Sequence, residues 1–257
     1  MTTNANIPSE PGVYPNVPFA DYLRIKAWNH SPLSVGVKYP MTHVRHARDT
    51  SSDTPSASMR IGSALHAWML EREKYPSIVA IAPDVDRRTK AGKEAWGVFE
   101  FASIGKVIIT AEEEATVKAM GAAIGMHPRA RKLALTPGER ECVVIWRDES
   151  TGLLCKARID KLIRTAGIGV DIKTTRDASP DSFERSVLDY CYYTQLAFYA
   201  DGWKAATGEE LSFFILAVEN DSPHGVAVYQ IDDETMDIGR FEMRRVLAEV
   251  AACEKSG

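Results

Sequence analysis

The stretch that decides the fold is ECVVIWRDESTGLLCKARIDKLIRTAGIGVDIKTT, residues 141–175. Apolar and polar residues alternate in it over three runs, which are separated by turn-forming residues near 148–152 and 164–167. Successive side chains of a strand point to opposite faces of a sheet, so this alternation predicts three adjacent strands joined by short turns. Two more strands are expected at about 211–218 and 225–231.

Helical patterns surround these strands. We expect a short helical segment between about 19 and 38, and helices at about 59–73, after the basic segment 87–96, at 111–128, over 180–208 and from Asp233 onward. The polar stretch 46–58 predicts a surface loop, and the proline-rich residues 1–18 predict an extended arm. The predicted fold class is therefore α/β, with a central mixed sheet flanked by helices and a helical N-terminal part. Residues 1–58 would form an arm with short helices, and 59–257 the main domain, with the two parts forming one continuous structural unit.

The charge, the cysteines and the apolar runs of the sequence limit the classes of protein to which it can belong. The net charge of −4 argues against coating nucleic acid through bulk charge, so any phosphate-binding surface has to be local. The four cysteines are widely spaced and form no zinc motif, which indicates a reduced compartment. With no leader-like or membrane-spanning apolar run, the sequence predicts a cytoplasmic protein that does not associate with a membrane.

Two of the predicted strands carry charged side chains in register with their alternation. Lys156, Arg158 and Asp160 share one face of the second strand, and Asp171 and Lys173 share one face of the third. Hard divalent cations bind carboxylate and carbonyl oxygens, so the two aspartates and the Ile172 carbonyl are suitable ligands. Lys173 could orient or deprotonate a water molecule, or stabilise charge on a phosphate. The alternative is a structural ion pair between Asp171 and Lys173.

These residues form part of a longer ordered series: Gly62-Ser-Ala-Leu-His66, Arg158-Ile-Asp160, Asp171-Ile-Lys173 and Gln195-Leu-Ala-Phe-Tyr199. From about residue 59 to 231 the sequence resembles the RecE-type exonucleases (exodeoxyribonuclease VIII) and their phage relatives in the PD-(D/E)XK superfamily. The resemblance implies a restriction-endonuclease-like core. It also implies that His66 binds metal together with Asp160, Asp171 and the carbonyl of Ile172.

Several of the candidate residues have a structural interpretation beside the functional one. His66 could equally be a core histidine, and Gln195 and Tyr199 could be core packing rather than catalytic residues. Glu71 and Glu141 are secondary candidates: Glu71 lies about 140° around an ideal helix from His66, and the strand parity of Glu141 is open. By the resemblance, Arg158 and the basic cluster would contact DNA, although the cluster could be a solvated surface; its members are Arg87, Arg88, Lys90 and Lys93.

The resemblance implies a magnesium-dependent exonuclease, with Mn²⁺ able to substitute. It would degrade double-stranded DNA ends 5′ to 3′, leave single-stranded 3′ tails for a single-strand annealing recombination protein, and form a ring-shaped homo-oligomer. The alternatives are an endonuclease or Cas4-like nuclease of the same superfamily, a non-catalytic DNA-binding protein that keeps the fold, and a hydrolase of another phosphoester.

Overall fold

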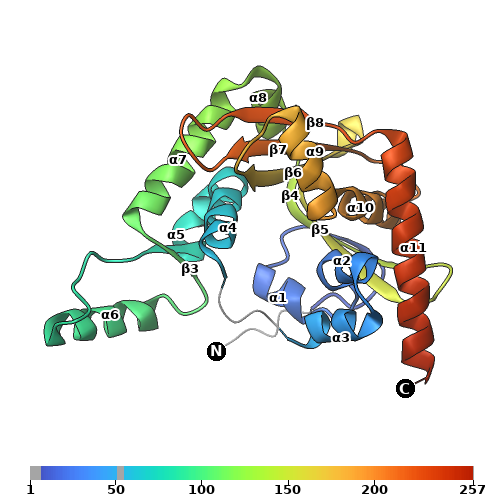
Figure 1. The fold of residues 1–257 in the computed structure, drawn as a ribbon, viewed down its shortest axis with the longest axis horizontal. Coiled ribbons are helices and arrows are strands. Elements are labelled where there is room, and N and C mark those ends of the chain that lie inside the picture. Colours follow the sequence, from blue (N-terminus) through green and yellow to red (C-terminus); the bar gives the residue numbers. More distant parts are fainter. Residues whose placement is uncertain (1–6, 51–54, 257) are drawn as a thin grey trace.

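The computed structural model describes residues 7–50 and 55–256, and their centre is a mixed sheet (Figure 1). Its strand order is β1-β4-β5-β6-β7-β8. The β6–β7 pair is parallel, and the other neighbouring pairs are antiparallel. In chain order these strands are β1 (Gly12–Tyr14), β4 (Glu139–Arg147), β5 (Leu154–Ile163), β6 (Ile168–Thr175), β7 (Ser212–Glu219) and β8 (Val226–Tyr229). The predicted α/β class with a central mixed sheet is confirmed.

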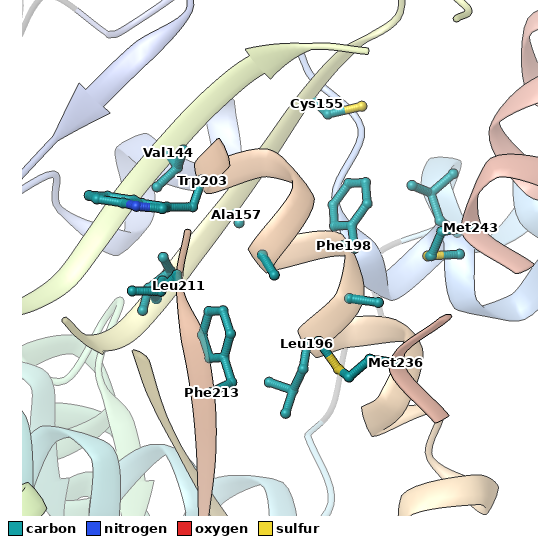
Figure 2. Packing of buried hydrophobic residues seen from close by; sticks show 14 of the residues in the cluster. Val144, Cys155, Ala157, Leu196, Phe198, Trp203, Leu211, Phe213, Met236 and Met243 are labelled. Atoms are coloured by element: carbon teal, nitrogen blue, oxygen red, sulfur yellow. The ribbon is translucent and has the colours of Figure 1, made fainter. Parts of the chain in front are cut away.

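Helices cover both faces of the sheet, as predicted. On one face lies α10 (Tyr192–Thr207), with α11 (Asp233–Ser256) and α2 (His30–Lys38) packed against it. The other face carries α4 (Ala57–Leu70), α7 (Ala111–Met126) and α8 (Pro128–Leu135). Because α10 lies between the sheet and α11, it is apolar around most of its circumference. Figure 2 shows Trp203 of α10 on the side of Val144 and Leu211, and Phe198 on the side of Met243 of α11.

The strands end where the sequence predicted turns. Asp148 closes the β4–β5 turn by accepting hydrogen bonds from the backbone and hydroxyl of Thr151. Gly167, with φ +60°, lies in the β5–β6 connection, a conformation that glycine adopts without steric cost. Both hairpins therefore follow from local sequence.

The N-terminal part differs from the expectation in three places. Residues 12–14 of the expected arm form the edge strand β1, paired with β4 of the same chain. The single helical segment expected between about 19 and 38 is two helices, α1 (Phe19–Arg24) and α2, and Pro32 lies in the first turn of α2. The predicted loop at 46–58 is wrong at both ends: 46–49 belong to α3 (Met41–Asp49) and 57–58 to α4, while 51–54 lie outside the described residues.

Two short strands were not predicted, and some helices have other bounds than expected. β2 (Val79–Ile81) and β3 (Val107–Ile109) form a small parallel sheet. The helix expected after the basic segment 87–96 is α6 (Lys90–Ala102), which begins within that segment and stands away from the body of the molecule (Figure 1). The helical region 180–208 is two helices, α9 (Pro180–Asp189) and α10, because the backbone turns at Cys191 with φ +56°. The helix predicted at 59–73 ends at Leu70, and the short helices η1 (Arg72–Lys74) and α5 (Tyr75–Ile78) follow.

Among the described residues, no helix combines the length and apolar character that crossing a bilayer requires.

Candidate active site

The site forms where β5 and β6 separate. Their ladder pairs residues 161–163 with 168–170 and stops there. Beyond it, the carboxylate of Asp160 takes the place of a strand partner, because Oδ2 accepts the backbone N–H of Ile172 at 2.8 Å. The separation leaves the Ile172 carbonyl free of β5 and directed to a side chain of α4.

That side chain is His66. Its Nε2 lies 2.9 Å from the carbonyl oxygen of Ile172, and its Nδ1 lies 3.5 Å from Oδ2 of Asp160. Burial by itself lowers the pKa of His66, but the carboxylates of Asp160 and Glu141 raise it, and the net result is a pKa above the ordinary value. Both ring nitrogens thus face oxygen atoms, and a neutral imidazole has only one N–H to offer them. A second proton on the ring, or a metal ion bound at one ring nitrogen, satisfies this arrangement.

Glu141 completes a cluster with His66 and Asp160, in which one ligand atom of each residue lies within 4.8 Å of the others. The β4–β5 register pairs the neighbours of Glu141 with the neighbours of Asp160, so the two carboxylates stand opposite each other. The structure therefore places the side chain of Glu141 on the same face of the sheet as that of Asp160, a point that the sequence left open. Burial, with the nearby Asp160, raises the pKa of Glu141 to about 7. Its backbone has φ +50°, an uncommon conformation for a non-glycine residue that often marks functional sites.

Asp171 and Lys173 lie beside this cluster on β6. Nζ of Lys173 is 2.7 Å from Oδ2 of Asp171, and Asp171 is 3% exposed. Burial lowers the pKa of Lys173, but Asp171 and Asp160 outweigh it and raise the pKa above its usual value. Nε2 of Gln195, on α10, donates to Oδ1 of Asp171 at 3.1 Å and lies 3.1 Å from the hydroxyl of Tyr199. Gln195 thus contacts Asp171 directly, and Tyr199 contacts it through Gln195, whereas a catalytic role for the two residues stays a prediction.

Arg158 links the cluster to the end of α4. Its guanidinium lies 2.8 Å from Glu141 and 3.7 Å from Glu71. Glu71 is the C-cap residue that follows the last residue of α4, so its backbone is not helical. The angle of an ideal helix therefore does not separate its side chain from His66. Its other oxygen is 2.8 Å from Lys74. Glu71 therefore reaches the outer edge of the site through Arg158, and it is not among the clustered ligand atoms.

The donor atoms fit a divalent metal ion. The cluster offers an imidazole nitrogen and carboxylate oxygens, the Ile172 carbonyl adjoins the same imidazole, and Asp171 follows on the strand. Oxygen-rich sets of this kind suit Mg²⁺ or Mn²⁺, and imidazole is accepted more readily by the transition metal. His66, Glu141, Asp160, Asp171 and the carbonyl of Ile172 could hold such an ion.

The site opens into a cleft of about 620 Å³. His66, Glu141 and Asp160 line one side, and residues of α1 and the start of α2 line another. His30 lies there, 8% exposed, with Nε2 2.8 Å from the hydroxyl of Thr194. Burial, and then the charge of Lys173, lowers the pKa of His30 to about 3. Sequence reasoning missed His30, since no local pattern distinguishes it from other histidines.

The basic cluster predicted to contact DNA does not line this cleft. Arg88 forms an ion pair with Asp86 at 2.9 Å, and the guanidinium of Arg87 lies 4.1 Å from the ring centre of Trp96. Lys90 and Lys93 lie on α6, which projects from the body (Figure 1). Contact between these residues and DNA stays a prediction about the projecting part of the chain.

The sheet, the D-x-K strand and the converging ligands together define the PD-(D/E)XK nuclease class of fold. A family model described as "PDDEXK-like domain of unknown function (DUF3799)" matches residues 38–257, and the chain belongs to this family. Nucleases of the class use divalent metal ions, in agreement with the donor set described above.

Comparison with one solved structure supports the same fold, and a second has a much lower TM-score that supports no conclusion. A crystal structure from Eubacterium rectale, named "putative exonuclease", has a TM-score of 0.57 and 17% sequence identity, with 86% of this chain and 80% of that chain covered. The crystal structure of SSO0001 has a TM-score of 0.31 and 13% identity over 90% of this chain and 87% of that chain. No curated protein matches the chain significantly.

Proposed function

We propose that this chain is a magnesium-dependent exonuclease that hydrolyses phosphodiester bonds at double-stranded DNA ends. The observation that carries the proposal is the convergence of His66, Glu141 and Asp160 next to the Asp171–Lys173 pair of the following strand. Mn²⁺ should substitute for Mg²⁺, because the donor set includes an imidazole.

The residues divide the reaction between them. When bound, a divalent ion lowers the pKa of water and offsets charge on the phosphate. Lys173 is paired with Asp171, and we assign its remaining ammonium hydrogens to a phosphate oxygen, where they would stabilise charge that grows in the transition state. Gln195 holds Asp171 in orientation through Oδ1 and is itself positioned by Tyr199.

Action on DNA ends, 5′ to 3′ polarity and delivery of 3′ tails to a single-strand annealing protein belong to the same proposal. They are supported by the motif series shared with RecE-type exonucleases, and the name given to the Eubacterium rectale structure agrees with exonuclease action. A ring-shaped homo-oligomer is proposed on the same resemblance, and light scattering on the purified chain tests it.

A digestion assay tests the activity. Linear duplex labelled at the 5′ or the 3′ end, with a covalently closed circle beside it, is incubated with Mg²⁺ or with a chelator. We expect metal-dependent loss of linear DNA, an intact circle and no activity in Asp171→Asn. Glu209→Gln, an exposed carboxylate outside the cleft, is the matched control and should retain activity. Equal loss of the circle would favour an endonuclease, and DNA binding without cleavage would favour a non-catalytic protein. Cleavage of small phosphoesters without turnover of DNA would indicate a different hydrolase.

A further inference from the structure

The cleft has an apolar wall facing its charged one. Phe19 and Leu23 of α1 line it and are 55% and 62% exposed. They are four residues apart on a helix and therefore share a face. Two large apolar side chains left in water at the mouth of a polar site indicate a ligand that is itself partly apolar.

This wall is fixed to the sheet by a buried lysine. Nζ of Lys156, a residue that is 4% exposed, donates to the carbonyl oxygens of Tyr22 and Ile25 at 2.8 Å each. These two carbonyls belong to the last turn of α1 and to the residue that follows it, and each also accepts a backbone N–H, so the ammonium group is a second donor that ties this end of α1 to β5. The ring of Phe19 also lies against that of Tyr22, with centroids 6.2 Å apart and planes 20° from parallel. Phe19 is therefore held in place before any ligand binds.

Phe19 is also close to the metal-binding side chains. The guanidinium carbon of Arg158 lies 5.0 Å from the centre of the Phe19 ring, and the same guanidinium is bonded to Glu141. Only one residue thus separates an exposed aromatic ring from the candidate ligand cluster. A nucleotide combines the two matching chemistries, an anionic phosphate and a flat apolar base.

We propose that Phe19, flanked by Leu23, stacks against an unpaired nucleobase next to the scissile phosphate. The proposal rests on the nuclease function proposed above and adds a subsite to it. Aromatic rings stack on any base, because every base has a π-face, so the contact tolerates any sequence. In an intact duplex both faces of an internal base are covered by its neighbours, and Phe19 therefore favours a frayed or single-stranded end.

The test compares binding to DNA with and without bases. Anisotropy of a labelled oligothymidylate and of an abasic oligomer of equal length is measured with full-length Asp171→Asn protein, which should not cleave either. We expect the base-containing strand to bind about tenfold more tightly, in line with the stacking of one base. Adding Phe19→Ala should remove most of this preference, and Phe19→Trp should restore it. Phe241, a 66% exposed ring on α11 outside the cleft, is the matched control, and Phe241→Ala should leave the preference unchanged.

Three results would overturn the proposal: no preference in the parent protein, an unchanged preference in Phe19→Ala, or equal weakening of both strands. Circular dichroism of each variant establishes that it is folded, which the exposure of Phe19 favours. Digestion of linear duplex by the wild-type protein separates the two hypotheses. Digestion with an unchanged preference in Phe19→Ala refutes the stacking alone, whereas absence of both digestion and DNA binding refutes the nuclease and the stacking together.

Discussion

Lys173 allows a direct test of whether the Asp171–Lys173 pair is structural or catalytic. Lys173→Met removes the ammonium but keeps most of the apolar stem, and it leaves the carboxylate of Asp171 buried. Breaking a buried ion pair on one side costs about 3 to 5 kcal/mol of unfolding free energy. Gln195 still donates to Asp171, and the Lys173 side chain is 17% exposed, so the lower figure of about 3 kcal/mol is expected.

The double variant Asp171→Asn/Lys173→Met separates the two roles. Without the buried charge it should regain most of the lost stability, measured by urea unfolding in a chelator, because no unpaired carboxylate remains. DNA hydrolysis should stay at least about a hundredfold below wild type in Lys173→Met and in the double variant, since removing an electrostatic catalytic group costs that much. Near wild-type hydrolysis in either variant would refute the catalytic assignment and leave a structural ion pair.

Three further predictions concern other parts of the structure. His30→Gln should flatten the pH dependence of the unfolding free energy. The pKa of His30 is about 3 in the folded protein and near 6.5 in the unfolded chain, so the wild type loses stability as the pH falls from 6.5 towards 3, by at most about 1.4 kcal/mol per pH unit. Urea unfolding of both proteins at about pH 5 and 7 measures the difference. Gly202→Ala should lower the unfolding free energy by about 1 to 3 kcal/mol, because a Cβ there would lie 2.6 Å from an indole ring. Gly125→Ala is the control: a Cβ there would meet open space, so the melting temperature should not fall. Arg158→Met should weaken Mn²⁺ binding at least about tenfold in calorimetry by releasing Glu141, and unchanged affinity would contradict that role.

The part of the site that local sequence could predict is the part set by strand alternation. Asp160 and Asp171 lie on neighbouring strands because two short turns join three alternating runs. Both turns could be predicted from turn-forming residues such as Gly167. His66 was predicted from the order of the motifs, which resembles that of RecE-type exonucleases. No strand pattern could predict it, because it lies on a separate helix and reaches the strands only in the folded chain.

What the sequence could not predict depends on register and on distant contacts. Glu141 faces Asp160 because of the β4–β5 register, and its left-handed backbone leaves no mark in the sequence. The contact between His30 and Thr194 joins residues 164 positions apart, so no local periodicity reports it. The break at Cys191 was hidden for a similar reason, because the helical pattern continues on both sides of a turn that tertiary packing imposes.

Strand β5 explains why a sheet interior tolerates three charged side chains on one face. Burying a charge is costly unless it is paired or hydrogen-bonded, and each of the three is compensated differently. Lys156 donates to the carbonyls that end α1, Arg158 pairs with Glu141 beside the ring of Phe19, and Asp160 accepts from β6 and faces His66. The two-residue spacing of the strand thus places Lys156 under the apolar wall, Arg158 beside Phe19 and the candidate metal ligand Asp160 in one row. An apolar replacement of Lys156 would remove a buried charge from the sheet, but it would also remove the hydrogen bonds that tie the end of α1 to β5. Lys156 therefore contributes to the site by placing Phe19 relative to Asp160.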